Sequence, residues 1–386
     1  RICVRYECVP MRFIKHVYKI HTYAQDGRLF EGKTPVSAFL NSSYDGSFIA
    51  GLMELRYIQS LPVERIINYF ESHGFTLKKP TAHKLMEKAS SLFENLYKCI
   101  RQTALSDPYK AADETYYKIL VPEKNSKGKG VRKGYLWVVV GINTRMIYLL
   151  YDDGSRSEKV ILNELGGCKG IIQSDGYSPY RKLESDAYPH ITRIPCLQHI
   201  KRKFIDCGED EPDAKRIVEL INTLYQNEHK HKIGVDGWTV EQNLVHRKKY
   251  APDILGEIKD VLDDIEERGD LLPKSELKEA VTYLRNEWNA VVDIFNYGDT
   301  YLDNNIVERM NRYISLSRKN SLFFGSHKGA ERGAILYTIA LTCRMNKVNL
   351  FEYLTDVINR TAEWQPNTPL EKYRQLLPDR WEKAND

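Results

Sequence analysis

The order of extended and helical segments between residues 105 and 205 constrains the fold of this chain most strongly. β-rich runs at 116–121, 135–140 and 146–151 are separated by a glycine- and lysine-rich hairpin loop and by a turn at Asn143-Thr144. A helical pattern at 157–165 follows, then β-rich runs at 170–174 and 191–194 and a basic helix at 199–204. Three antiparallel strands, a helix and a β-α-β unit predict an α/β sheet with helices on its faces.

This order of elements is that of the ribonuclease H-like fold, in its retroviral-integrase-type form. We therefore predict an α/β catalytic core in two parts, residues 105–205 and 301–363. Residues 206–300 carry apolar stripes at helical spacing and no strand pattern, so we expect a helical insertion between the two parts. The tail, residues 364–386, contains proline and tryptophan and is expected to wrap the core in extended form.

The chain before this core divides into two further regions. Residues 1–45 predict a small β-rich segment, with extended signals at 2–9 and 13–18. Residues 46–104 are helical by pattern and are broken at Pro62, Gly74 and Pro80, which is typical of a helix-turn-helix-like DNA-binding region. An ordinary three-helix bundle explains this second pattern equally well.

Composition places the chain in the soluble globular class. Of 386 residues, 28% are charged and the net charge is +5, so the position of the basic residues matters more than their excess. The sequence has no run of eighteen apolar residues and no signal peptide, which argues against a membrane span. Seven scattered cysteines fit reduced thiols in a cytoplasm. Because the chain begins with Arg1 and not Met, we expect the natural N-terminus to lie upstream.

Three acidic residues are candidates for catalysis and metal binding. Asp113 is expected at the mouth of the first strand, Asp175 follows the fourth, and Glu308 lies on a later helix that Asp303 is expected to cap. The first and fourth strands are neighbours in the predicted sheet, so these carboxylates can meet and hold Mg²⁺, or Mn²⁺ in its place. Two such ions support in-line phosphoryl displacement by a water or a 3′-hydroxyl. Taken singly, each acid is more often a turn aspartate or a surface glutamate.

Zinc is not expected as a cofactor. Cys196-x-x-His199 is half a zinc site with no second pair at matching spacing, and the same holds for Cys3 and Cys8 with His16 and His21. A Cys–His nucleophile pair stays open as an alternative. The basic helix beside His199 favours phosphate contact, with His199 orienting the backbone or lying near the metal site.

Basic residues are expected to form a broad DNA-binding face, although about half of any such set are ordinary solvated side chains. The candidates are Lys84, Lys88, Lys118, Arg132, Lys133, Lys201, Arg202, Lys203, Arg309, Arg312, Arg318, Lys319, Lys328 and Arg332.

Several longer motifs carry a resemblance to a known family. They are Ala112-Asp113-Glu114-Thr115, Gly134-Tyr135-Leu136-Trp137, Ser174-Asp175-Gly176-Tyr177, Cys196-x-x-His199-x-x-Arg202-Lys203-Phe204, Asp303-Asn304-Asn305-x-x-Glu308-Arg309 and Arg318-Lys319-Asn320-x-x-Phe323-x-Gly325-Ser326-x-x-Gly329-x-Glu331-Arg332. From about residue 45 to 363, the chain resembles a transposase of the insertion sequence 66 family, the large catalytic subunit of that bacterial mobile element.

The resemblance implies DDE chemistry, with the triad falling on Asp113, Asp175 and Glu308, and Mg²⁺-dependent cutting and joining at element ends. It also implies DNA and accessory proteins of the element as partners, and we expect a homo-oligomer in the DNA complex. The family usually has a cysteine-paired zinc segment before its helical region, whereas residues 16–31 contain no cysteine. The family's N-terminal helical segment is also missing from this sequence. The alternatives are a DNA-binding remnant without catalysis and a metal-dependent nuclease without strand transfer.

Overall fold

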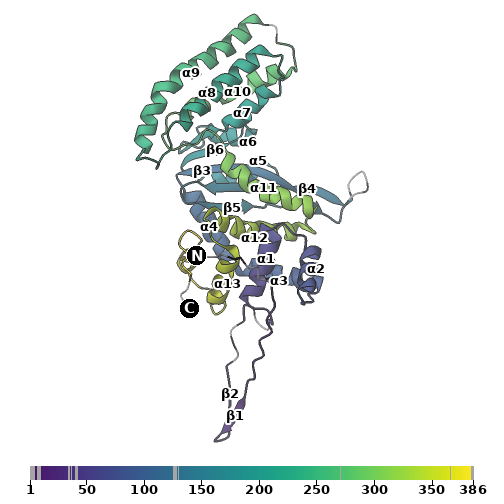
Figure 1. Ribbon diagram of the computed structural model, residues 1–386. Coiled ribbons are helices and arrows are strands. Elements are labelled where there is room, and N and C mark those ends of the chain that lie inside the picture. The colour runs from purple at the N-terminus through teal and green to yellow at the C-terminus, as the bar shows by residue number, and fades with distance from the viewer. Residues whose placement is uncertain are drawn as a thin grey trace.

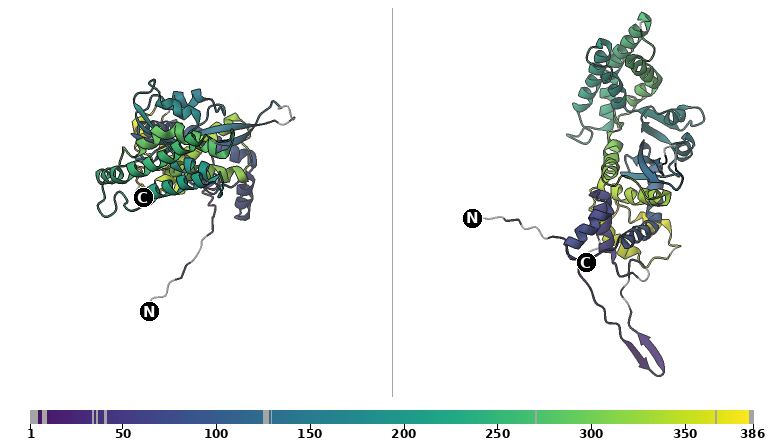
Figure 2. Two further views of the ribbon diagram at one scale, coloured as in Figure 1. Left: turned by 90° about the horizontal axis from the view of Figure 1, so that it is seen from above. Right: turned by 90° about the vertical axis from the view of Figure 1, so that its right-hand side faces the viewer.

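The computed structural model describes residues 5–6, 10–33, 35, 37–39, 42–124, 128, 130–269, 271–365 and 367–383. Cys3, Cys8 and most of the strand expected at 2–9 lie outside these residues. The molecule is elongated: a helical bundle lies at one end, a β-sheet in the middle, and further helices and a β-hairpin at the other end (Figures 1 and 2).

The sheet in the middle has five strands, and the protein is therefore a mixed α/β structure. The strands are β3 (Tyr109–Leu120), β4 (Val131–Gly141), β5 (Met146–Leu150), β6 (Gly170–Ser174) and β7 (Ile191–Pro195). Their order is β5-β4-β3-β6-β7; β4 is antiparallel to both of its neighbours, β3 and β5, and β6 and β7 run parallel to β3. The strands expected at 135–140, 146–151, 170–174 and 191–194 are all present.

The first strand of the sheet differs from its prediction. β3 begins at Tyr109, well before the expected start at residue 116, and Asp113 therefore lies inside the strand instead of at its mouth. The pattern was obscured because Lys110, Asp113 and Glu114 interrupt the apolar run that marks a buried strand. β3 pairs with β4 from Lys110 to Leu120, and this long ladder holds the polar residues in extended conformation.

The free edge of the sheet at β5 is covered by a helix. α12 (His327–Met345) places two threonine hydroxyls on the backbone of β5: Thr342 Oγ1 donates to the carbonyl of Ile147 at 2.8 Å, and Thr338 Oγ1 accepts from the amide of Leu149 at 2.9 Å. Such contacts satisfy backbone groups that an edge strand would otherwise expose. α4 (Glu94–Ser106) also contacts β4 and β5.

The remaining N-terminal helices share one hydrophobic core with the sheet. They are α1 (Gly46–Met53), a π-helical turn (Glu54–Ile58), α2 (Val63–Ser72) and α3 (Lys79–Leu92), and α1 packs against α13 (Leu350–Thr361). Ile66 and Phe70 of α2 and Leu85 of α3 are buried in this core. The proposed helix-turn-helix thus uses one face of α3 for packing and leaves Lys84 on the exposed face.

The helical bundle at the other end is built around a second core, which also includes Tyr109, Ile171 and Ile194 of the sheet. It comprises α7 (Leu197–Ile205), α8 (Pro212–His229), α9 (Val240–Arg268) and α10 (Glu276–Ile294). Leu197, Ile200 and Phe204 lie in this core, so its packing begins with α7, directly after β7. The chain then returns to the sheet as α11 (Asn305–Asn320).

A buried arginine ties the bundle to the segment that leads back to α11. Arg247 of α9 is 1% exposed at its side chain and pairs with Glu228 of α8 at 2.7 Å. Its guanidinium also donates to the carbonyls of Ile294 at 3.2 Å and Thr300 at 2.6 Å. Buried charges are normally paired and hydrogen-bonded in this way.

Shorter elements complete the fold: α5 (Glu158–Leu165), α6 (Ser178–Arg181), a 3₁₀ turn (Lys182–Glu184) and α14 (Leu370–Arg374). The tail after residue 364 therefore contains a helical turn and is not wholly extended. The predicted strand at 13–18 is wrong, since the β-structure of this region is the hairpin β1 (Thr22–Gln25) and β2 (Arg28–Glu31). The hairpin reverses at Asp26-Gly27, where both residues have positive φ, and its strands pair with each other, whereas the run at 13–18 has no partner strand.

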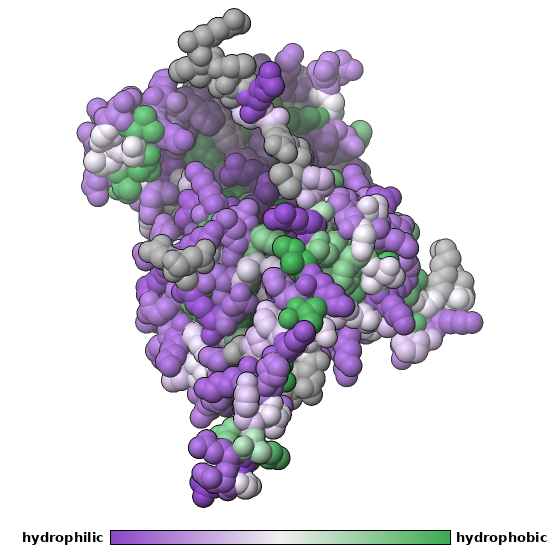
Figure 3. Space-filling model, turned by 60° about the horizontal axis from the view of Figure 1, so that its bottom comes forward, coloured by the Kyte–Doolittle hydropathy of each residue, from purple (hydrophilic) through white to green (hydrophobic). Residues whose placement is uncertain are grey.

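The β1–β2 hairpin stands away from the body, and all of its strand residues are exposed (Figure 1). Seen from that end, the surface is mainly hydrophilic, with hydrophobic side chains in separate small spots (Figure 3). Among the described residues, none of the helices combines the length and the apolar character that crossing a membrane requires.

Candidate active site

The register of the sheet brings Asp113 and Asp175 together. The parallel pairing of β3 with β6 ends with Ala111 opposite Gln173. Asp113 and Asp175 each lie two residues further along, so they are level with each other. β6 ends at Ser174, and Asp175 is therefore the first residue beyond its carboxyl end. The negative charge of Asp175 acts on Asp113, as expected for neighbouring carboxylates.

The environment of Asp113 disfavours its charged form. Burial, the Glu114 carboxylate and the Asp175 carboxylate, in decreasing order, raise the pKa of Asp113 to about 8. Hydrogen bonds oppose this only in part: Asn311 Nδ2 donates to Asp113 Oδ2 at 2.7 Å, and the Glu114 amide donates to Oδ1 at 2.9 Å. A positive ion beside Asp113 would relieve the electrostatic cost of its ionisation.

Glu308 lies in the first turn of α11, on the side of the helix that faces β3. Asn311, one turn further along, contacts Asp113, and residues three apart on a helix share a face. The expected N-cap was wrong: α11 begins after Asn304, and Asp303 instead accepts a hydrogen bond from the Asn305 amide at 3.1 Å. Glu308 is therefore nearer to the start of its helix than the predicted cap implied.

Asn304 fixes the start of α11 to both neighbouring elements. Its side-chain Nδ2 donates to the carbonyl of Ala112 at 2.9 Å, and its backbone amide donates to Cys196 Sγ at 3.2 Å. Asn304 is 1% exposed, so these bonds are shielded from water. The residue before Asp113 and the start of the Glu308 helix are thus joined directly. Asn304 makes no side-chain cap bond to its own helix, and among the described residues its Oδ1 is buried without a hydrogen-bond partner.

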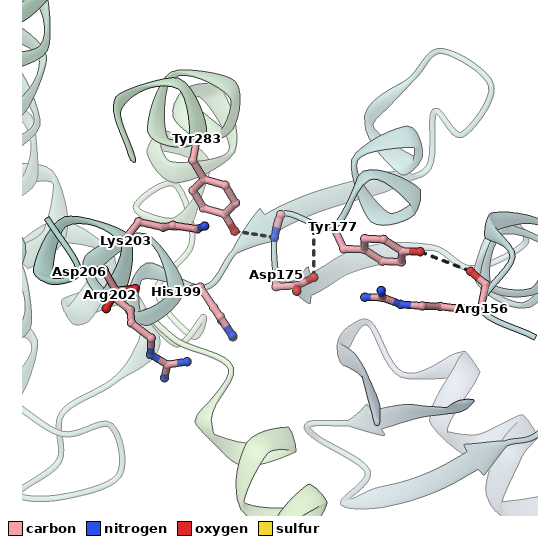
Figure 4. Close-up of a pocket in the computed structure, with 9 residues that line it drawn as sticks. Arg156, Asp175, Tyr177, His199, Arg202, Lys203, Asp206 and Tyr283 are labelled. Atoms are coloured by element: carbon pink, nitrogen blue, oxygen red, sulfur yellow. Dashed lines mark hydrogen bonds between the residues drawn. The ribbon is translucent and has the colours of Figure 1, made fainter. Parts of the chain in front are cut away.

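An open cleft of about 410 Å³ lies beside Asp175 (Figure 4). Its wall carries one acid from the predicted triad together with cations from α7 and from the loop before α5. The lining residues are Arg156, Asp175, Gly176, Tyr177, His199, Arg202, Lys203, Asp206 and Tyr283. Carboxylate next to guanidinium and ammonium groups is an arrangement that can hold a metal ion and a phosphate together.

The turn that carries Asp175 is held from the side of the helical bundle. Tyr283 Oη of α10 accepts a hydrogen bond from the Gly176 amide at 2.8 Å, as Figure 4 shows, and a Cβ at Gly176 would lie 2.5 Å from that oxygen. Arg193 Nη1 of β7 donates to the carbonyl of Asp175 at 3.2 Å. Arg193 is in turn paired with Glu287 of α10, and both side chains are fully buried.

Glu114 and Arg156 form a second charged contact at the site. Glu114, 7% exposed at its side chain, pairs with Arg156 at 2.5 Å, and Arg156 also stacks on the ring of Tyr177 at 4.2 Å. Burial raises the pKa of Glu114. Sequence reasoning missed Arg156, Arg193, Tyr283 and Glu287. An arginine inside the apolar run of β7 was the one local signal, because a buried arginine requires an acidic partner.

The predicted DNA-binding residues fall into two groups. Arg202 and Lys203 line the cleft, and other members are exposed on α3, β3, β4, α11 and α12. This exposed group is Lys84, Lys118, Arg132, Lys133, Arg309, Arg312, Lys319 and Lys328. Within this group, Lys133 also lies over the ring of Tyr116 at 4.7 Å.

The second group is partly occupied by contacts within the protein. Arg318 donates to the carbonyl of Tyr116 at 2.5 Å and stacks on its ring at 4.0 Å, while Arg332 pairs with Glu87. Lys88 lies over the ring of Phe39 at 5.4 Å, and Lys201 is half-buried. Arg318, Arg332 and Lys88 thus have structural partners that the sequence did not reveal.

Most of the sequence matches a known protein family. The family described as Transposase IS66 family matches residues 41–332. This chain belongs to the IS66 transposase family. Membership indicates a transposase role, in which a protein of a mobile element binds DNA.

Three curated relatives from Sinorhizobium fredii (strain NBRC 101917 / NGR234) support this placement. The uncharacterized protein y4jD is 25% identical over 86% of this chain and 65% of its own length. The uncharacterized proteins y4hP and y4qI are 24% and 26% identical, over 98% and 95% of this chain and 70% and 69% of their own lengths. The chain thus spans about two thirds of the length of the curated relatives that it matches.

Proposed function

We propose that this IS66-family chain is a DDE-type transposase with a ribonuclease H-like core, which cleaves DNA at element ends and transfers the strand to target DNA. The observation that carries the proposal is that Asp113, inside β3, lies beside Asp175, the first residue beyond the carboxyl end of the parallel strand β6. Glu308 follows on a helix that is bonded to β3 through Asn304 and Asn311. The strand order β5-β4-β3-β6-β7 supports the ribonuclease H-like assignment.

The donor chemistry of these residues fits a divalent metal site, although in the described part of the chain the ligand atoms of the three acids do not all lie within 4.8 Å of one another. Asp113, Asp175 and Glu308 offer hard carboxylate oxygens, the ligands that Mg²⁺ and Mn²⁺ prefer. Glu308 Oε1 and Asn311 Oδ1 are shielded from water and lack a hydrogen-bond partner, as expected where a cation would complete the site. When bound, such ions would activate a water or 3′-hydroxyl and stabilise the leaving oxygen.

The protein's own groups supply position and charge. Arg156, Arg202 and Lys203 place positive charge around the cleft, where a scissile phosphate would lie beside Asp175. Tyr283 and Arg193 hold the Asp175 turn, so the carboxylate is oriented before a metal or DNA arrives. We propose the exposed basic residues as the DNA-binding face, a homo-oligomer as the form that acts on paired ends, and accessory proteins of the element as partners.

The proposal is tested with labelled duplexes carrying the element's ends, in Mg²⁺ or Mn²⁺. Replacing Asp175 with asparagine is expected to lower cleavage by at least about a hundredfold, because a charge-stabilising group is lost, while DNA binding persists. Asp186→Asn, at an exposed aspartate in the turn after the 3₁₀ element, is the matched control and should cleave normally. Undiminished cleavage by Asp175→Asn would remove the assignment.

Product analysis separates the alternatives. Strand-transfer products from the wild type identify a transposase, and cleavage without such products identifies a nuclease. DNA binding without metal-dependent cleavage identifies a DNA-binding protein that lacks the chemistry.

A second prediction concerns the contribution of Arg202 to DNA binding. Arg202→Ala should weaken DNA binding and reduce the slope of log K against log salt by about 1, since one phosphate contact is lost. Lys215→Ala, on an exposed position of α8, is the charge-matched control. Fluorescence anisotropy at several salt concentrations gives both slopes. Equal slopes for Arg202→Ala and the wild type would show that Arg202 does not contact phosphate.

A further inference from the structure

Cys196, His199 and Glu308 form a cluster of unlike metal-binding groups beside the proposed active site. Their ligand atoms all lie within 4.8 Å of one another, and His199 Nε2 is 3.7 Å from Glu308 Oε1. Within the described part of the chain, this is the one group of three or more His, Cys, Asp or Glu residues with such spacing. The sequence showed only the Cys-x-x-His half, because Glu308 joins it from a distant helix.

The starts of helices α7 and α11 hold these three side chains close to one another. Cys196 precedes the first residue of α7 and His199 lies in the first turn, so both are at the same end of that helix. Glu308 lies in the first turn of α11. The bond from the Asn304 amide to Cys196 Sγ joins the two helix starts, and Cys196 is 1% exposed. The sulfur therefore has a fixed position relative to Glu308.

Two atoms of the cluster have unmet bonding capacity. His199 Nδ1 and Glu308 Oε1 are both shielded from water and have no hydrogen-bond partner. Buried polar atoms in folded proteins nearly always have one, and an unpartnered atom in a functional region points to a missing ligand. A cation bonded to Glu308 Oε1 and His199 Nδ1 would satisfy both atoms, whereas one bonded to Nε2, the nitrogen 3.7 Å from Glu308 Oε1, would satisfy the glutamate oxygen alone.

We propose that Cys196, His199 and Glu308 bind a borderline-soft divalent cation of the Zn²⁺ type. Thiolate, imidazole and carboxylate are the donors that Zn²⁺ takes, at about 2.0–2.3 Å each, so side-chain rotations within the cluster suffice to close the site. On binding, the thiol loses its proton to solvent, and the sulfur keeps the bond from the Asn304 amide. Three protein ligands leave a fourth position for water.

This site shares Glu308 with the proposed catalytic site, and its regulatory consequence rests on that proposed function. An ion bound by Cys196 and His199 also binds the Glu308 carboxylate, which is then not available to the proposed Mg²⁺ site. Zn²⁺ bound here therefore opposes Mg²⁺-dependent cleavage. Sulfur and nitrogen donors select against Mg²⁺, so the two ions do not simply exchange in one site.

Cobalt(II) titration of the full metal-free chain tests the site directly. Co²⁺ bound by a thiolate gives a near-ultraviolet charge-transfer band, and tetrahedral Co²⁺ gives visible bands. We expect both in the wild type and their loss on adding Zn²⁺. Cys196→Ser should abolish the charge-transfer band, and His199→Gln and Glu308→Gln should each weaken Co²⁺ binding about tenfold or more. Cys207→Ser, at a half-buried cysteine just beyond α7, is the matched control and should keep the wild-type spectrum.

The outcomes are distinct from those of the cleavage assay. A wild type without a thiolate–Co²⁺ band, or a band unchanged in folded Cys196→Ser and His199→Gln, overturns the site; circular dichroism reports folding. Asp113→Asn removes a proposed catalytic ligand but not a member of this cluster, so its Co²⁺ spectrum should match the wild type. A normal spectrum together with cleavage that is unaffected by Asp175→Asn would leave the soft-metal site standing and remove the DDE assignment.

Discussion

Replacing Asp113 with asparagine will abolish metal-dependent cleavage and, in the metal-free protein at pH 8, increase thermal stability. The two effects have one cause. Burial and the neighbouring Glu114 and Asp175 carboxylates raise the pKa of Asp113 to about 8, so its ionisation is unfavourable in the folded chain. A metal ion would compensate for this cost, and asparagine removes both the cost and the proposed ligand.

The direction of the pH effect follows from proton linkage. The pKa of Asp113 in the unfolded chain is near the ordinary 3.8, whereas in the folded protein it is about 8. Between these values the folded state binds the extra proton, so this group lowers stability as pH rises from about 4 to about 8. Below this window the group contributes no penalty, and above it the penalty is complete. Asparagine stays neutral throughout and can still accept the bond from Asn311.

Thermal unfolding in a chelator at pH 5 and pH 8 checks the stability effect. The melting temperature should differ less between the two pH values for Asp113→Asn than for the wild type or the control Asp186→Asn. Adding Mn²⁺ at pH 8 should raise the melting temperature of the wild type and not that of Asp113→Asn. Equal stabilisation of both by Mn²⁺ would show that Asp113 is not a ligand.

Replacing Glu287 with alanine should destabilise the protein by about 3–5 kcal/mol, the usual cost of leaving one member of a buried ion pair alone. Arg193 and Glu287 are both fully buried, and Arg193 keeps only the partly exposed Glu184 as a charged partner once Glu287 is gone. Burial raises the pKa of Glu287 even beside Arg193, so desolvation outweighs the attraction between them. The ion pair of Arg193 and Glu287 therefore contributes more to positioning the Asp175 turn than to the stability of the fold.

Urea unfolding measures this effect, and two further variants define its origin. Glu287→Gln keeps a hydrogen-bond acceptor for Arg193 and should lose less stability. The double variant Arg193→Met with Glu287→Leu removes both charges and should recover much of the loss. It also removes the bond to the Asp175 carbonyl, so cleavage should stay reduced. Full cleavage by this stable double variant would contradict a role for Arg193 in holding the Asp175 turn.

The sequence predicted those parts of the fold that short-range patterns determine. β6 and β7 were predicted from their β-branched residues, Ile171 and Ile172 in β6 and Ile191, Thr192 and Ile194 in β7, and α5 because Ser157 caps a short amphipathic segment. The first half of β3 was missed because its polar residues are stabilised by partners on other elements, as in the contact of Asp113 with Asn311.

The same distinction applies to the candidate site. The positions of the three acids were proposed from strand ends and a motif. Arg193, Glu287 and Tyr283 hold the Asp175 turn only because the helical bundle packs against it. The spacing of residues along the sequence does not predict that packing. The third member of the Cys196 cluster was missed for the same reason, since it comes from α11.

The hydrogen bonds of Arg247 have a consequence for any variant in which helices of the bundle are deleted. This side chain on α9 holds the segment between α10 and α11 by its carbonyls, and the same segment delivers Asn304 to the sheet. A variant with α8 and α9 deleted would therefore not be a minimal core with its chemistry intact. It would lose the side chain that holds the segment between α10 and α11, and with it the fixed start of the helix that carries Glu308. This loss would occur although Asp113 and Asp175 lie on other elements.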